Sequence, residues 1–185
     1  MTPRILLLPG WLDSGATHWQ TRWEQAHGFE RVQQDDWQWP RRGDWMARLE
    51  DTLLADERPA VLVAHSLGCH LVAAWAAHSQ HRARAAAALL VAPPDVTRPD
   101  LPPQLHNWAR ELRRPLPFAS TLVFSTNDPF ADAARSRQMA ADWGSELLDL
   151  GAAGHINGDS GLGDWPAGLA QLRAVMARAG LAPGF

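Results

Sequence analysis

The sequence lacks lysine and tyrosine altogether, and Cys69 is its single cysteine among 185 residues. One cysteine cannot form an intramolecular disulfide or a cysteine metal cluster, so neither is expected. Positive charge is not in excess either, because the formal net charge is −3 at pH 7. The chain therefore lacks the excess of positive charge that would attract nucleic acid or an anionic membrane surface, and we expect neither as a partner.

Long hydrophobic runs are also missing. The apolar stretch near the N-terminus covers only residues 5–8 before a Pro-Gly pair, which is too short for a signal peptide or a membrane span. We therefore expect a cytoplasmic protein without a membrane-bound segment. No repeat or low-complexity linker divides the chain, so a single domain over residues 1–185 is predicted.

Short apolar runs alternate with longer amphipathic segments along the whole chain. The predicted strands are residues 5–8, 60–64, 87–91, 121–125 and 146–150, with a weaker one at 31–34. The predicted helices are residues 16–27, 44–55, 67–78, 103–112, 131–143 and 166–179. This alternation predicts an α/β fold with a mostly parallel sheet of about six strands and helices on both faces. Function is then expected at the carboxyl ends of the strands.

The strand at residues 60–64 runs into Ala-His-Ser-Leu-Gly at residues 64–68, followed at once by an apolar helix. This matches the nucleophile elbow G-x-S-x-G with alanine at the first position. Small residues on both sides of Ser66 allow the strand and helix to approach closely, and the sharp turn exposes the serine hydroxyl. An incidental serine in a plain strand–turn–helix is the alternative, but the position after a buried strand favours a nucleophile.

A serine hydroxyl needs a base, and His155 is the best candidate among eight histidines. It lies in a glycine-rich loop after the strand at 146–150, whereas several other histidines fall inside predicted helices. Asp128 follows the strand at 121–125 in a turn sequence, and it is either a turn former or the group that orients His155. The chain order Ser, Asp, His is that of α/β-hydrolases.

Acyl transfer also requires donors for a developing oxyanion. The backbone N–H of Leu67, which follows the nucleophile, should supply one donor. The loop after the first strand should supply the other, and we favour the N–H of Trp11 with that of Leu12 as the fallback. The glycine-rich residues 158–163 are expected to shape the rim beside His155. Asp35 and Asp36 lack further ligands at a suitable spacing, so no metal site is predicted.

Several segments together resemble a known family, the small serine hydrolases grouped with retinoblastoma-binding protein 9 and bacterial YdeN. They are Pro-Gly-Trp at 9–11, His-Trp at 18–19, Gln-Asp-Asp-Trp at 34–37, the elbow at 64–68, Asn-Asp-Pro at 127–129 and Gly-His-Ile-Asn at 154–157. The resemblance covers nearly the whole chain and is strongest to the bacterial branch. It implies a minimal three-layer α/β-hydrolase fold without a large cap domain, and it maps nucleophile, acid and base onto Ser66, Asp128 and His155.

The sequence therefore predicts a cofactor-independent serine esterase that acts on a small ester or related acyl bond. An acyltransferase or thioesterase with the same triad remains an alternative, as does a non-catalytic binding module on the hydrolase fold. The proline-rich segment 93–117 is too short for a large lid, so an open, shallow site that favours short acyl groups is expected. The oligomeric state and the physiological substrate stay open.

Overall fold

A computed structural model describes residues 2–185, and these contain one six-stranded sheet in which every strand pair is parallel. The strands are β1 (Arg4–Leu8), β2 (Glu30–Arg31), β3 (Ala60–His65), β4 (Ala85–Val91), β5 (Ala119–Phe124) and β6 (Glu146–Asp149). Their order across the sheet is β2-β1-β3-β4-β5-β6. The predicted parallel α/β fold is confirmed.

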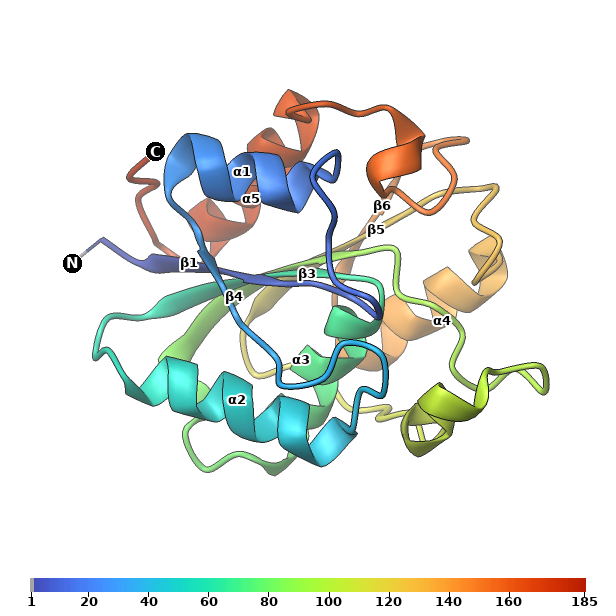
Figure 1. Ribbon diagram of the computed structural model, residues 1–185. Helices are drawn as coiled ribbons and strands as arrows, with labels where there is room; N and C mark the ends of the chain where they lie inside the picture. Colours follow the sequence, from blue (N-terminus) through green and yellow to red (C-terminus); the bar gives the residue numbers. More distant parts are fainter. Residues whose placement is uncertain (1) are drawn as a thin grey trace.

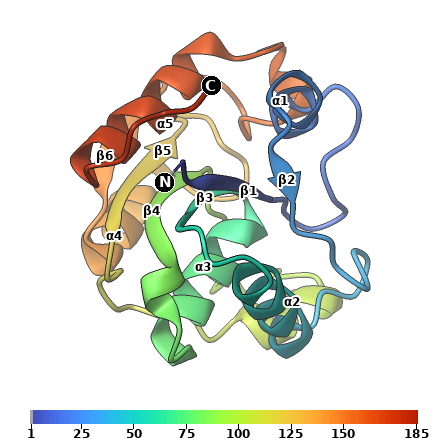
Figure 2. The same cartoon turned by 90° about the vertical axis from the view of Figure 1, so that its left-hand side faces the viewer.

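Five α-helices cover the two faces of this sheet (Figures 1 and 2). They are α1 (Trp19–His27), α2 (Arg42–Leu54), α3 (Leu67–His78), α4 (Ala133–Trp143) and α5 (Pro166–Arg178). Helices α1 and α5 pack on one face, and α2, α3 and α4 pack on the other. Three short 3-10 helices lie between them: η1 (Arg82–Arg84), η2 (Pro103–Trp108) and η3 (Gly158–Ser160).

The central strands β1, β3 and β4 are apolar except at their ends, where Arg4 and His65 lie, because helices bury both of their faces. In β1, Ile5 and Leu7 pack toward α1 and α5, whereas Leu6 and Leu8 pack toward α2 and α3. The same alternation runs through β3, and all of its residues are buried. Two hydrophobic clusters therefore sandwich the sheet and hold its carboxyl ends at one edge of the molecule.

Three predicted elements differ from the structure. The weak strand at residues 31–34 is the two-residue β2 at Glu30–Arg31, an edge strand too short to carry an apolar pattern. The helix predicted at 103–112 is only the 3-10 helix η2, since the surrounding prolines remove backbone donors. Helix α1 begins at Trp19 rather than residue 16, because the His18 side chain caps it by accepting the Gln20 N–H.

Membrane-spanning segments were also sought among the described residues. Within residues 2–185, no helix combines the length and apolar character needed to cross a bilayer.

Candidate active site

Ser66 occupies the turn between β3 and α3, at the carboxyl edge of the sheet. Its backbone adopts φ 54° and ψ −124°, a conformation that L-residues rarely hold and that costs free energy. The Ser66 N–H donates to the Val91 carbonyl at 2.9 Å, which ties the turn to the neighbouring strand β4. The surrounding sheet thus maintains a strained turn, as the elbow motif predicts.

Two glycines explain how the turn packs so closely. A Cβ on Gly68 would lie 2.3 Å from the Leu8 carbonyl oxygen, so only glycine lets α3 start directly against the end of β1. A Cβ on Gly10 would lie 2.7 Å from the Ser66 Cβ and 3.1 Å from its Oγ. The loop after β1 and the serine are therefore in direct contact, with no room for an added methyl group.

His155 and Asp128 complete a hydrogen-bonded chain with Ser66. His155 Nε2 is 2.9 Å from Ser66 Oγ, and His155 Nδ1 is 2.9 Å from Asp128 Oδ2. An ionised carboxylate can only accept, so the proton of the neutral imidazole is on Nδ1, and Nε2 accepts from the serine hydroxyl. The side chains of His155 and Asp128 are buried. The structure brings together the three residues that were predicted from three separate strand ends.

The loop that carries His155 is held by side chains at the end of β5. Asn127 Oδ1 accepts the Gly154 N–H at 2.8 Å, and Ser125 Oγ accepts the Ala153 N–H at 2.9 Å. The sequence analysis missed the roles of both residues. An Asn or a Ser is common in any turn, and the sequence does not show whether its side chain accepts hydrogen bonds from a distant loop. From the opposite side, the buried Trp19 donates its indole N–H to the carbonyl of Ile156 at 2.8 Å.

Two further histidines pack behind His155. His65 Nε2 donates to the His155 carbonyl at 2.9 Å, and the His65 ring lies 4.9 Å from the His155 ring. Burial first, and then the proximity of His155 and His18, hold the pKa of His65 well below its usual value. Burial, the charge of Arg31 and the proximity of His155 lower the pKa of His18 to about 4. Both rings are therefore neutral at pH 7. His65 supports the His155 loop through its hydrogen bond to the His155 carbonyl.

The backbone donors predicted for an oxyanion differ in availability. Leu12 donates its N–H to the Trp37 carbonyl at 3.1 Å, so the fallback donor is already engaged. Among the described residues the backbone N–H of Trp11 makes no hydrogen bond, and Trp11 lines the same pocket as Gly10 and Ser66. Leu67 is the first residue of α3, where a backbone N–H has no acceptor within the helix. Trp11 and Leu67 thus remain the candidates.

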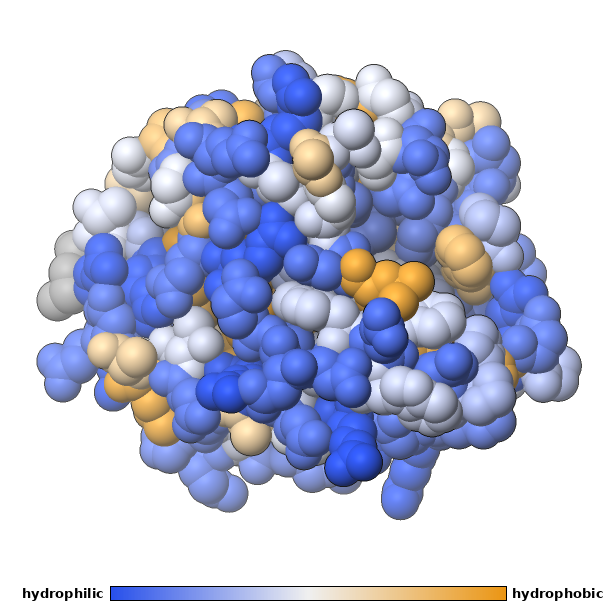
Figure 3. Space-filling model, viewed as in Figure 1, coloured by the Kyte–Doolittle hydropathy of each residue, from blue (hydrophilic) through white to orange (hydrophobic). Residues whose placement is uncertain are grey.

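Two pockets meet at this site. One, of about 460 Å³, is lined mainly by apolar residues that include Leu12, Leu67, Leu101, Leu105 and Phe130. The proline-rich segment 93–117 forms one wall of it through residues that include Leu101 and Leu105, and the open, shallow site expected from sequence stays a prediction. The volume lies within the range of small-molecule sites. A hydrophobic surface area is visible at the end of the molecule toward which the strands run (Figure 3).

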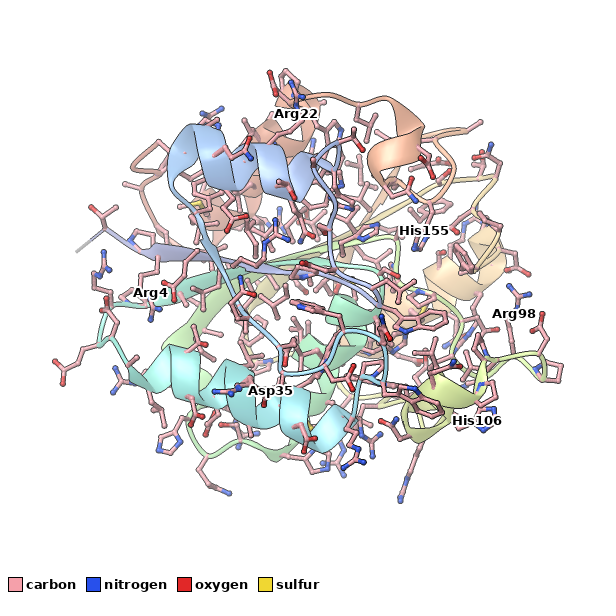
Figure 4. The ribbon with its side chains drawn as sticks, viewed as in Figure 1. Arg4, Arg22, Asp35, Arg98, His106 and His155 are labelled. Carbon is pink, nitrogen blue, oxygen red and sulfur yellow. The ribbon has the colours of Figure 1, made fainter. Side chains whose placement is uncertain are left out.

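The other pocket, of about 200 Å³, is lined by polar groups that include Asp13, Thr17, His18, Asn157 and Asp159. Both pockets contact Ser66 and His155. His155 lies at the same end of the sheet as Arg98, which lines the apolar pocket (Figure 4). Gly158 also lines the polar pocket, in agreement with the rim expected for residues 158–163.

Metal-binding side chains and the lone thiol were examined for further chemistry. Across the described chain, from residue 2 to 185, no three His, Cys, Asp or Glu side chains are grouped so as to hold a metal ion. Cys69 is fully buried one turn into α3, and burial raises the pKa of its thiol. It packs as a small hydrophobic residue rather than as a nucleophile.

Comparisons with known proteins agree with the fold. A family model described as serine hydrolase matches residues 5–174. A YdeN-like hydrolase of Pectobacterium atrosepticum is 30% identical, with a TM-score of 0.86 over 96% of this chain and 92% of that one. The ydeN gene product of Bacillus subtilis is 22% identical, with a TM-score of 0.76 over 95% and 100% of the two chains. The carboxylesterase CesB of B. subtilis shares 14% identity and the fold, with a TM-score of 0.62 over 98% and 85%. A comparison with curated proteins found no match.

Proposed function

Because the chain belongs to the serine hydrolase family, we propose that it cleaves a small ester or related acyl bond through Ser66, His155 and Asp128. The observation that carries the proposal is the continuous hydrogen-bonded chain from Ser66 Oγ through His155 to Asp128, with both heavy-atom distances at 2.9 Å. This arrangement has the geometry that a serine needs to become a nucleophile at neutral pH.

In the first half of the reaction, Ser66 Oγ attacks the carbonyl carbon while His155 Nε2 removes the hydroxyl proton. The tetrahedral oxyanion accepts hydrogen bonds from the backbone N–H groups of Trp11 and Leu67. The intermediate then collapses, the bond to the leaving group breaks, and His155 gives that group its proton. Water repeats the sequence on the acyl-enzyme, so that the acid is released and Ser66 regains its proton.

Asp128 orients the ring of His155 and stabilises the imidazolium that forms during each step. Its Oδ1 also accepts the Phe130 N–H at 2.9 Å, which fixes the carboxylate in its turn. The neighbouring His65 and His18 are neutral, so no positive charge behind His155 opposes the imidazolium. The dipole of α3 adds favourable charge where the oxyanion develops, because Leu67 is its first residue.

The test is covalent labelling with a fluorophosphonate probe, alongside hydrolysis of p-nitrophenyl acetate. Wild-type protein should label and turn over, and Ser66→Ala should do neither. Ser79→Ala is the matched control, because Ser79 caps the opposite end of the same helix, where it contacts Glu50. Labelling that persists in Ser66→Ala would refute the assignment.

A further inference from the structure

The two pockets that meet at Ser66 differ in chemistry. Most of the lining of the larger pocket is leucine, proline and Phe130, and its charged residues Asp95, Arg98 and Asp100 are held in ion pairs. The smaller pocket is lined mainly by carboxylate, hydroxyl, amide and imidazole groups. A substrate bound across Ser66 extends into both. The apolar half of the substrate is therefore expected in the larger pocket and the polar half in the smaller one. An apolar group in the polar pocket would leave polar atoms without hydrogen-bond partners.

His18 is the group in the smaller pocket that most needs a partner. Its side chain is buried, with 5% of the residue exposed, and Nε2 finds no hydrogen-bond partner among the described residues. Nδ1 accepts the Gln20 N–H at 3.1 Å, so the proton of the neutral ring is on Nε2. A buried donor without an acceptor is costly. Less than 1 Å² of Nε2 is exposed, so an oxygen atom of a bound substrate would satisfy it once the imidazole turns toward the pocket that His18 lines.

Charge in the smaller pocket further limits the ligand. Asp13 and Asp159 line it, and no arginine does. Asp13 is paired with Arg31 at 2.7 Å, whereas Asp159 is exposed at the rim. A carboxylate or phosphate on the substrate would therefore meet negative charge, but hydroxyl groups would find both donors and acceptors.

The position of His155 indicates which half of the substrate enters each pocket. The leaving group must stay beside His155 Nε2 to receive its proton. Gly158 and Asp159, which follow His155 in the same loop, line only the smaller pocket, whereas Asn157 lines both. Leu67, whose N–H faces the oxyanion in the proposed mechanism, lines the larger one.

We propose that the substrate joins an apolar acyl group to a compact, hydroxyl-bearing alcohol without negative charge, with the alcohol bound against His18 and the acyl group in the leucine-lined pocket. This inference rests on the proposed function and adds the substrate class. It identifies His18 as a binding residue for the leaving group, outside the Ser66–His155–Asp128 chain.

Three butyrate esters of similar size test the proposal: glyceryl monobutyrate, propyl butyrate and the butyryl ester of glycolate. Wild-type kcat/KM should be highest for the glyceryl ester and lowest for the glycolate ester. His18→Asn keeps a residue that can cap α1 but removes the Nε2 donor, so the glyceryl-to-propyl ratio should fall about two- to tenfold. A merely structural role for His18 would lower both rates in parallel and leave that ratio unchanged.

Asp159→Asn removes the rim charge without changing its size. We expect the ratio of kcat/KM for the glycolate ester to that for propyl butyrate to rise about two- to fivefold. Equal wild-type rates on all three esters would overturn the inference, as would a preference for propyl glycerate, which carries its hydroxyl groups on the acyl side. Fluorophosphonate labelling of Ser66 distinguishes the proposed substrate class from the proposed function. Labelling without selectivity among the esters refutes the substrate class alone. Failure to label refutes the proposed function.

Discussion

Gly10 offers the sharpest test of how tightly the loop after β1 is fitted to the serine. Replacing it with alanine would place a methyl carbon 2.7 Å from Ser66 Cβ and 3.1 Å from Ser66 Oγ. The Gly10 backbone is not in the left-handed region, so alanine is conformationally allowed and space is the whole difficulty. The perturbation therefore acts on the position of two neighbouring segments and leaves their chemistry untouched.

The size of the effect follows from this distance. Carbon atoms pack best at about 3.5–4.0 Å, so the loop and the serine must separate by roughly 1 Å. Overpacking of this kind costs about 1–3 kcal/mol of stability. A misplacement of about 1 Å at the reacting atoms lowers turnover about 10²-fold. The Trp11 N–H can then no longer donate to the oxygen of the carbonyl group whose carbon Ser66 Oγ attacks.

The assay is kcat/KM for p-nitrophenyl acetate together with the free energy of unfolding in urea, measured for Gly10→Ala and Gly43→Ala. A Cβ on Gly43 meets nothing within 4 Å, and Gly43 lies in α2 far from the serine. That control should keep its activity and its free energy of unfolding, because the added methyl group has open space in the first turn of α2. Gly10→Ala with activity within threefold of wild type would refute the reasoning.

Three further predictions follow from the same geometry. Asp128→Asn keeps the size of the side chain but loses its charge, and kcat should fall about 10³–10⁴-fold, whereas Asp132→Asn, at the cap of α4, should remain active in the same assay. Butyryl esters should exceed acetyl esters by about tenfold in kcat/KM, because each methylene buried in the 460 Å³ pocket contributes about 0.8 kcal/mol, and equal rates would contradict this use of the pocket. The pKa of His18 is lowered to about 4 from 6.5, so the unfolded chain binds more protons between these values and stability must fall as the pH drops through this window. His18 should contribute about 2 kcal/mol to the loss between pH 7.5 and 5 in urea titrations, on top of the loss caused by the lowered pKa values of His65 and His70. The loss in His18→Asn should therefore be smaller by about that amount, and an equally steep loss would rule His18 out as a source.

The elements that the sequence predicted well are those whose environment is uniform. Strands β1, β3 and β4 are apolar apart from Arg4 and His65 at their ends because helices cover both of their faces, and that pattern can be read without coordinates. The edge strand β2 and the 3-10 helix η2 have no such pattern. Their form depends on pairing with β1 and on the packing of the proline-rich segment, which are long-range effects.

Sequence alone determined the candidates Ser66, Asp128 and His155, because parallel strands place their carboxyl ends at one edge and each residue follows a different strand. It favoured Trp11 over Leu12 as donor, but it could not show the hydrogen bond from Leu12 to Trp37 in another loop that engages the Leu12 N–H. Nor could it show that His18 lies buried beside Ser66. Local patterns report which face of an element is covered, whereas the partners of a polar atom are set by segments far away in the chain, and only the tertiary structure brings those together.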